Sequence, residues 1–456
     1  MLVLFVIVAV RPDATTGGWN CAGIPPHHPL RCHTRTVPSL LQVSSEANVS
    51  LFWVLLAAVL APVITRLTRK LIPQVVCLLG LGVLIGPSML GLGDPHGLEM
   101  LKQLGLGLLF LSAGYEIDPG ELQGRQFRKA TITWSVSLAL AIGLALIVLR
   151  DQPWLSAVAL AIALSSTALG TLLPILRENG LLDSALGRAV LAHGTVGELG
   201  PVAAMALVLS GNGPWIGGLL LIGFGLLTVF LAWFTRRHAR RVAERMVTAA
   251  VAREQPDIER FREWFVHTGQ HQLTQGLLRL IMLLLTGLMA LASLFDIDVA
   301  LGAFMAGLCL RLIVGKDTEP LDRRIGVLAN SFFIPVFFVT SGMAIDLAEV
   351  GAHLWIMFAA LGIVLLTRGL PVWLAERFTD TGSGLTTSSQ RLQLALYASA
   401  GLPIIVAVTE IAIGQQIMSQ ALGSCLVAAG ALSVLIFPFV AKRLGQPTAR
   451  QRKASG

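Results

Sequence analysis

The sequence predicts an all-α polytopic membrane protein with about thirteen transmembrane helices, in two inverted-topology repeats with crossed discontinuous helices. Of its 456 residues, 54% are hydrophobic and only 13% are charged, against about 25% charged in an average soluble protein. Apolar runs long enough to span a membrane recur from Leu51 onward, and two of them end in similar segments. The 46 glycines suit closely packed helices better than an outer-membrane barrel, whose strands alternate apolar and polar residues.

The predicted spans are separated by short connections that carry turn signals. They cover residues 51–67, 72–92, 99–117, 127–149, 154–177, 184–210, 214–235, 274–294, 297–313, 325–345, 352–374, 389–412 and 417–441. An odd number of spans places the two ends of this core on opposite sides of the membrane.

The net charge of +8 is distributed unevenly over the connections. If the C-terminus lies inside, most of the 34 Lys and Arg fall in inner connections, whereas the outer connections of the core contain only Arg150. A basic excess on the cytoplasmic side is typical of membrane proteins. We therefore expect a multi-pass protein of the cell (inner) membrane with a cytoplasmic C-terminus, embedded in lipid, and we expect no nucleic-acid partner.

The spans define the domain organisation. Residues 49–442 form the expected transmembrane domain, residues 236–270 a cytoplasmic linker between its halves, and residues 443–456 a basic cytoplasmic tail. The apolar run at residues 1–10 is too short to span a membrane. We expect residues 1–48 to lie outside the fold, as a disordered extension from a misassigned start codon, a signal-like segment or a genuine extracellular tail.

The sequence contains no motif that pairs a nucleophile with a base. The five cysteines are odd in number and lack paired metal-ligand spacing. We expect neither an enzyme, a metal centre nor a cofactor.

An internal repeat links residues 109–118 (LFLSAGYEID) with residues 337–346 (FFVTSGMAID). Each copy ends a span, the third and the tenth, and follows a glycine-rich span. Because a shift of seven spans is odd, the second copy must cross the membrane in the opposite sense. This is the pattern of inverted repeats in secondary transporters, although two apolar segments can also be similar by chance.

The fifth and twelfth spans, also seven apart, contain helix-breaking segments. The first holds Ser165, Ser166 and Thr167, whose hydroxyls can satisfy freed backbone groups. The second holds residues 399–403 and includes Pro403, which removes a backbone N–H. Two interrupted helices that cross near the midplane would offer carbonyls to a cation. Ordinary packing of small residues is the alternative.

Glu198 is the acidic residue deepest within a predicted span, and it is surrounded by glycines and a proline. An intramembrane carboxylate is costly and is a functional candidate by default. Glu198 could hold either a proton or a cation. The alternative is a neutral, hydrogen-bonded glutamate that serves packing.

Three further polar residues are candidates in the predicted spans. Arg368 lies too deep to reach the interface easily and needs an anionic partner, for which we expect Glu198, or a purely structural bridge. Glu410, near the outer end of its span, and His193 are candidate accessory residues; each could equally be structural.

Several segments together resemble the bacterial monovalent cation:proton antiporters of the sodium/hydrogen exchanger superfamily, in the branch of the potassium efflux systems. They are residues 81–87, 110–118, 163–168, 301–308 and 337–346. The similarity covers roughly residues 51–442, which is the membrane domain.

The resemblance implies a core panel with crossed broken helices and a dimerising panel, hence a homodimer. It implies that Glu198 is the ion-binding acid, that Arg368 is the basic residue of the neighbouring core helix, and that Ser165, Ser166 and Thr167 belong to the broken helix. Many family members have two adjacent acids, but the first position here is Gly197. A single carboxylate favours electroneutral exchange.

The leading functional hypothesis is a secondary transporter that exchanges sodium or potassium for protons by alternating access at one carboxylate. A gated potassium channel and a transport-inactive membrane sensor or scaffold are the alternatives.

Overall fold

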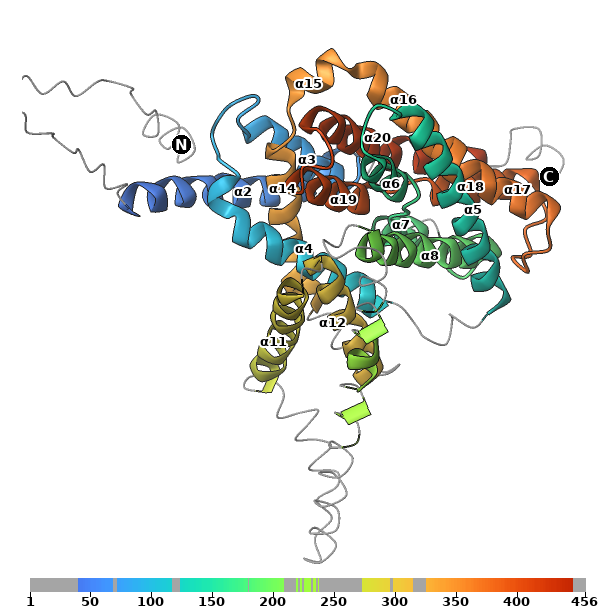
Figure 1. The fold of residues 1–456 in the computed structure, drawn as a ribbon, viewed down its shortest axis with the longest axis horizontal. Helices are drawn as coiled ribbons and strands as arrows, with labels where there is room; N and C mark the ends of the chain where they lie inside the picture. Colours follow the sequence, from blue (N-terminus) through green and yellow to red (C-terminus); the bar gives the residue numbers. More distant parts are fainter. Residues whose placement is uncertain are drawn as a thin grey trace, which may run out of the picture. The chain divides into compact units, whose positions relative to one another are not determined.

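The computed structural model describes residues 40–68, 72–116, 124–178, 180–208, 273–295, 298–314 and 325–445, together with parts of 219–237. All elements in these ranges are helical (Figure 1), which confirms the predicted all-α class. The predicted linker 236–270, most of segment 1–48 and the tail beyond residue 445 lie outside the described residues, as does much of the seventh predicted span.

Within the described ranges, seven helical segments are long and apolar enough to cross a membrane. They are Ala47–Leu67, Arg125–Val148, Trp154–Leu173, Ile325–Met343, Leu354–Phe378, Ser388–Gly414 and Gln420–Leu444, and three shorter apolar helices accompany them at Gln74–Ile85, Leu278–Leu294 and Val299–Ile313. The chain is therefore a multi-pass membrane protein.

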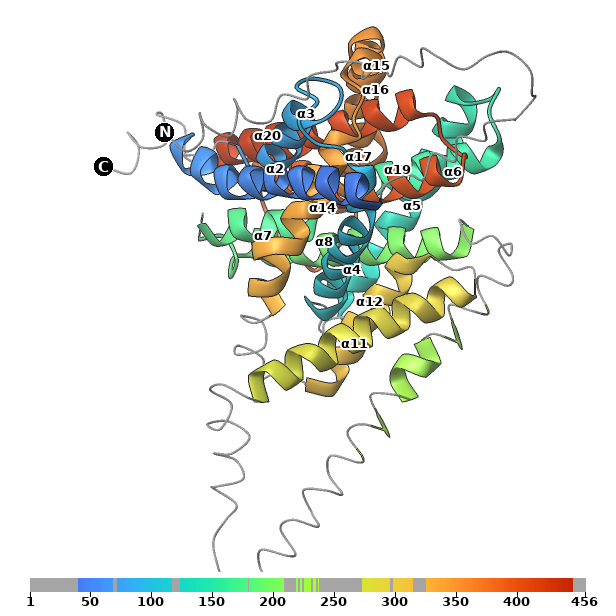
Figure 2. The same cartoon turned by 90° about the vertical axis from the view of Figure 1, so that its left-hand side faces the viewer.

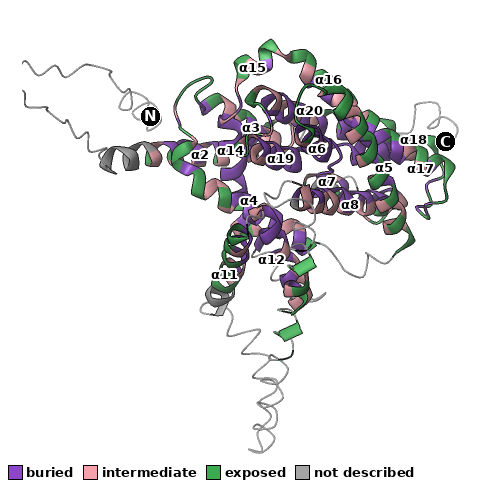
Figure 3. Cartoon of the chain, in the orientation of Figure 1, coloured by how far each residue is buried: buried purple, intermediate pink, exposed green. Residues whose placement is uncertain are grey.

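Exposed apolar side chains lie on the outer faces of these helices. On α5 (Arg125–Val148), Ile132, Val136 and Leu140 follow one another at four-residue intervals and are all exposed. Figure 3 shows the same exposure on the outer faces of α5 and α16, whereas α6, α14 and α19 are buried. A helix face of this kind suits the hydrocarbon of a bilayer, which has no hydrogen bonds to offer.

One set of helices, here called the panel group, packs together through its own contacts. It comprises α3 (Gln74–Ile85), α4 (Glu99–Glu116), α11 (Leu273–Leu294), α12 (Val299–Val314) and the π-helical turn η4 (Ala329–Phe333) that leads into α14 (Ile334–Met343). The short helix η1 (His96–Leu98) leads directly into α4, and α2 (Leu40–Leu67) is tied to the turn before η1 by Ser50, whose hydroxyl accepts the Asp94 N–H at 2.9 Å.

The second set, the core group, contains the predicted broken helices. It comprises α5, α6 (Trp154–Leu164), α7 (Leu169–Glu178), α8 (Ala185–Val208), α16 (Leu354–Val364), the π-helical turn η5 (Leu365–Gly369), α17 (Leu370–Phe378), α18 (Ser388–Ala398), α19 (Leu402–Gly414) and α20 (Gln420–Gly445). Helix α15 (Leu347–Ala352) joins the two groups along the chain, and the Asp346 side chain caps it by accepting two backbone N–H groups. Figure 1 shows α11 and α12 on one side of the molecule and α5, α8 and α17 on the other, and in Figure 2 α11 and α12 again lie at the edge of the bundle.

The panel group is assembled through two reciprocal pairs of glycines. A Cβ added to Gly114 of α4 would overlap the Phe304 carbonyl of α12, and one added to Gly307 of α12 would overlap the Leu111 carbonyl of α4. Gly82 of α3 and Gly342 of α14 approach each other's helices in the same way. Since Gly114 and Gly342 occupy equivalent positions in the internal repeat, each repeat motif packs on the glycine-rich helix of the other repeat. This packing is the one expected of inverted repeats.

Replacing Gly307 by alanine is expected to force α4 and α12 apart, because a backbone carbonyl cannot move aside as a flexible side chain can. We expect a loss of roughly 1–3 kcal/mol of stability, as for other overpacked interiors, measured as a lower melting temperature of the purified protein. Gly287→Ala in α11 is the matched control, since a Cβ there meets nothing within 4 Å. Equal melting temperatures for the two variants would contradict this account of the panel.

Candidate ion-binding site at the crossed helices

Two interrupted helices of the core group cross at their breaks. Helix α6 ends at Leu164 and α7 begins at Leu169, while α18 ends at Ala398 and α19 begins at Leu402. Three hydrogen bonds join the two unwound segments: Thr167 Oγ1 donates to the Ala398 carbonyl at 2.6 Å, Ser166 Oγ to the Gly401 carbonyl at 3.1 Å, and the Ala168 N–H to the Ala400 carbonyl at 2.6 Å. The freed carbonyls of the second break therefore find donors in the first, and the Thr167 N–H of the first break donates to the Gly197 carbonyl of α8 at 2.9 Å.

The predicted polar residues of these breaks differ in what they do. Thr167 reaches across the crossing, whereas the hydroxyl of Ser165 returns to its own helix and donates to the Ile162 carbonyl at 3.0 Å. The Ser166 hydroxyl lies between the two, 2.7 Å from the Ala163 carbonyl of its own helix and 3.1 Å from the Gly401 carbonyl across the crossing. Pro403 lies in the first turn of α19, where a missing N–H costs nothing. The break itself is at residues 399–401, so Pro403 starts the second half-helix rather than interrupting the first.

Glu198 lies on α8 beside this crossing. Its side chain is half-buried, and the backbone N–H groups of Leu169 and Gly170 interact with its carboxylate. The N-terminus of a helix carries partial positive charge and unpaired N–H groups, so it stabilises an anion there. The carboxylate of Glu116, at the end of α4, also acts electrostatically on Glu198. A half-buried acid at a helix start has the chemistry to exchange a proton for a small cation.

Arg368 is completely buried in the π-helical turn η5. Its Nε and Nη2 both donate to Thr167 Oγ1 at 3.2 Å, and Nη2 also donates to the His193 carbonyl at 2.9 Å. Its Nη1 has no hydrogen-bond partner among the residues described. The guanidinium thus links Thr167 of the crossing to the His193 carbonyl of α8.

Among the described residues, Arg368 and Glu198 do not form the expected ion pair. Arg368 instead donates to the Thr167 hydroxyl and the His193 carbonyl. The physical reason lies at Gly197. A Cβ at this position would come within 2.8 Å of Arg368 Nη2 and would overlap the Thr167 side chain. Glycine therefore leaves room for the guanidinium to enter between Thr167 and α8, away from the neighbouring Glu198 carboxylate.

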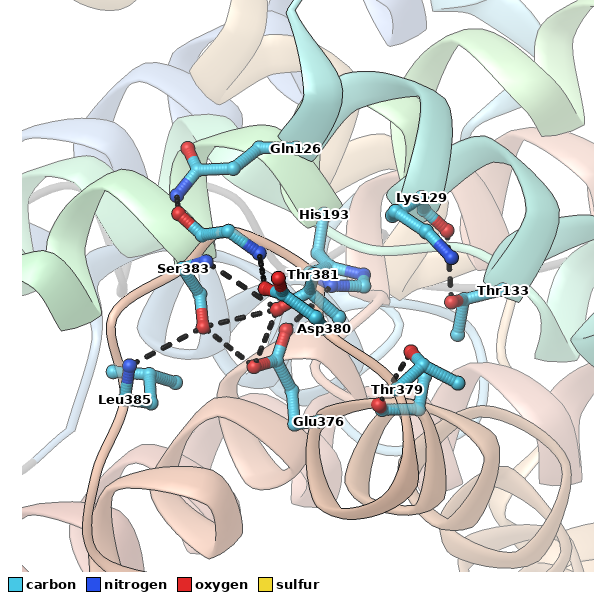
Figure 4. A network of polar contacts seen from close by, with 12 residues as sticks. Gln126, Lys129, Thr133, His193, Glu376, Thr379, Asp380, Thr381, Ser383 and Leu385 are labelled. Carbon is cyan, nitrogen blue, oxygen red and sulfur yellow. Dashed lines mark hydrogen bonds and ion pairs between the residues drawn. The ribbon is translucent and has the colours of Figure 1, made fainter.

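The sequence did not predict a further buried acid, Glu376, which contacts the ring of His193, the residue whose carbonyl accepts from Arg368. Its Oε2 accepts the hydroxyls of Ser383 at 2.6 Å and Thr381 at 2.9 Å, and its Oε1 is 3.8 Å from His193 Nε2 (Figure 4). The predicted span ended at residue 374, which assigned Glu376 to a connection. Thr381 and Ser383, five and seven residues later, are the sequence signal for a buried acid, because their hydroxyls can both donate to one of its carboxylate oxygens.

The two predicted accessory residues, His193 and Glu410, make their side-chain contacts away from the crossing. His193 is buried and contributes its backbone carbonyl to Arg368, while its ring faces Glu376. Glu410, in α19, forms an ion pair with Lys102 of α4 at 3.2 Å. The structure therefore brings together Glu198, Ser166, Thr167 and Arg368, with His193 at their edge and Glu410 elsewhere.

Interrupted helices that cross in an inverted-repeat bundle define the class of secondary transporters built in this way. The family described as "Sodium/hydrogen exchanger, transmembrane" matches residues 54–445. The chain belongs to this family, whose members are transporters rather than enzymes.

Individual relatives agree with the family. The chain is 23% identical over 415 residues to a protein of Bacillus subtilis (strain 168) provisionally named Na(+)/H(+) antiporter YjbQ, over 87% of this chain and 62% of that one. The chain thus spans less than two thirds of that relative. It is 25% identical over 328 residues to the Na(+)/H(+) antiporter NhaS4 of Synechocystis sp., over 64% of this chain and 74% of that one.

A solved structure has the same fold. The sodium proton antiporter MjNhaP1 of Methanocaldococcus jannaschii at pH 8 superimposes with a TM-score of 0.58 at 18% identity, over 89% of this chain and 100% of that one. At this identity the likeness concerns the fold alone.

Replacing Thr167 by valine keeps the side-chain shape but removes the hydroxyl that bonds both Ala398 and Arg368. We expect a loss of roughly 1–3 kcal/mol, because buried donors of the guanidinium lose their acceptor. Thermal unfolding of the purified variant measures it. The control is Thr409→Val, a buried threonine whose hydroxyl bonds only carbonyls of its own helix. A Thr167 variant as stable as this control would refute the role assigned to the hydroxyl.

Proposed function

We propose that the chain exchanges a monovalent cation, sodium or potassium, for protons across the membrane. The proposal rests on one observation above all: a half-buried Glu198 whose carboxylate meets the start of α7 beside the crossed breaks. The printed names of the two relatives and of the structural neighbour, all sodium and proton antiporters, support it.

In the proposed cycle, Glu198 loses its proton on one side of the membrane and binds the cation. In this cycle, hydroxyl and carbonyl oxygens of the breaks, among them those of Ser166 and Thr167, exchange some of their hydrogen bonds to replace part of the hydration shell. Alternating access then exposes Glu198 to the other side, where a proton displaces the cation. A ligand can drive this exchange only through different affinities for the two states, and competition at one carboxylate provides that coupling.

One carboxylate also sets the proposed stoichiometry. Glu198 has glycine rather than a second acid before it, and Arg368 Nη2 lies within 2.8 Å of where a Cβ of residue 197 would be. One site that alternates between one proton and one monovalent cation moves no net charge. Transport should therefore be insensitive to a membrane potential.

We place the C-terminus in the cytoplasm and the protein in the cell membrane, on the basis of the basic inner connections. We also propose a homodimer, by analogy with the family. The proposed topology defines which face of the protein is the outer one when it is reconstituted in vesicles.

Glu198→Gln should abolish exchange, since a neutral amide neither releases a proton nor holds a cation by charge. The test reconstitutes the full chain in vesicles, adds sodium or potassium outside and follows internal pH. As a control, Glu349→Gln removes an acid in the first turn of α15, outside the crossed helices. This variant should leave exchange unchanged. Normal exchange by the Glu198 variant would overturn the assignment, and cation currents without proton movement would favour a channel.

The same vesicles test electroneutrality. A valinomycin-imposed potassium diffusion potential should change the initial rate of sodium-driven proton movement by less than about twofold, whereas transport of one net charge per cycle is expected to respond more strongly. A steep dependence on the potential would require a second proton site.

A further inference from the structure

The ion pair between Lys102 and Glu410 connects the panel group to the core group, which otherwise meet mainly where α12 contacts α8 and α3 contacts α20. Lys102 belongs to α4, whose principal neighbours are α12, α14 and η4 of the panel group. Glu410 belongs to α19, which packs on α20, α6 and α8 of the core group. The Lys102 Nζ and Glu410 Oε1 atoms are 3.2 Å apart, and their side chains are only 14% and 21% exposed.

The pair lies toward the predicted outer side of the membrane. Helix α4 starts directly after the predicted outer connection at residues 93–98, and α19 ends at Gly414, next to the predicted outer connection before α20. Half-buried ion pairs are screened less than exposed ones and depend more on both partners. The charges therefore fasten the outer ends of α4 and α19 to each other.

One face of α4 runs from this ion pair toward Glu198. Glu116 follows Lys102 by almost four helical turns, so the two lie on nearly the same face and about 21 Å apart along the axis. Leu106, next to Lys102 on this face, is buried, whereas Leu109 and Ala113 are half-buried and Glu116 is exposed. Burial along this face therefore decreases from Leu106 toward Glu116, whose charge acts on Glu198.

The opposite face of α4 is occupied by the panel group. Gly107 contacts Met289 of α11, and Gly114 and Leu111 contact α12. Gly105 packs on Phe333 and Phe337 of η4 and α14. The face with Lys102, Leu109 and Glu116 lies beside this contact, and its two ends act on acids of the core group, Lys102 on Glu410 and Glu116 on Glu198. Glu99, one turn before Lys102, also acts on Glu410 and repels it. Without the Lys102 ammonium, the charges on α4 would push α19 away instead of holding it.

We propose that Lys102 and Glu410 form a latch that closes the outer side of the transport path in this conformation and must open before Glu198 can face outward. The inference rests on the alternating access proposed above. It assigns Glu410 a gating role instead of a place in the ion-binding site. Removing either charge shifts the population toward the outward-open state by the free energy that the pair contributes.

The test introduces a cysteine at Leu109, on the face between the latch and Glu198, and measures its labelling from outside by a membrane-impermeant thiol reagent in cells. The chain without this cysteine gives the background. Lys102→Met and Glu410→Gln should each raise the labelling rate by about fivefold or more, and the exchanged pair Lys102→Glu with Glu410→Lys should return it toward the original rate. Arg125→Met is the matched control: it removes an ion pair with Asp380 in the core group and should change nothing.

Labelling that stays at the original rate in both single variants overturns the latch. A double variant, Lys102→Met with Glu410→Gln, in which the two effects add fully would also overturn it. If the charges act only as a pair, the first substitution already removes their interaction and the second adds little. The outcome is separable from the proposed function. If Glu198→Gln still exchanges ions while Lys102→Met opens the outer side, the function assignment fails and the latch stands.

Discussion

The structure depends on satisfying backbone polar groups where no water is available. Two broken helices would each leave unpaired carbonyl and N–H groups in the membrane interior, and here the breaks pair with each other through Ser166, Thr167 and Ala168. Thr167 is central, because its hydroxyl donates to α18 and accepts from Arg368. A buried guanidinium is tolerated only where such acceptors exist, and the glycine at position 197 gives it the space to reach them.

The same arrangement separates the intramembrane charges by role. Arg368 is fixed in hydrogen bonds to the crossing, and Glu376 is fixed by two hydroxyls next to His193. Glu410 is fixed by Lys102. Glu198 differs from these groups, since it is half-buried and meets a helix start rather than a basic side chain. This difference is what makes Glu198 the proposed site for the exchanged cation.

The sequence alone predicted the helical membrane fold, the inverted repeat and the two breaks, because each leaves a local signal: apolar length, a repeated segment, or a run of small and hydroxyl residues. The partners of the buried charges could not be predicted in this way. Whether Arg368 reaches Glu198 or Thr167 depends on the space at Gly197, which is a property of three helices together. Glu376 was missed because α17 continues to Phe378, past the end of the predicted span at residue 374. The Lys102 to Glu410 pair was missed because it joins helices distant in sequence.

The central claim is that proton and cation compete for one carboxylate, Glu198. The most direct measurement is calorimetric titration of the purified protein with sodium or potassium in buffers of different ionisation enthalpy, which counts the protons released for each cation bound. The account predicts release of about one proton per cation at a pH below the one at which Glu198 titrates, a smaller release as the pH rises through it, and no heat of cation binding in Glu198→Gln. Cation binding without proton release, or undiminished binding in that variant, would contradict it.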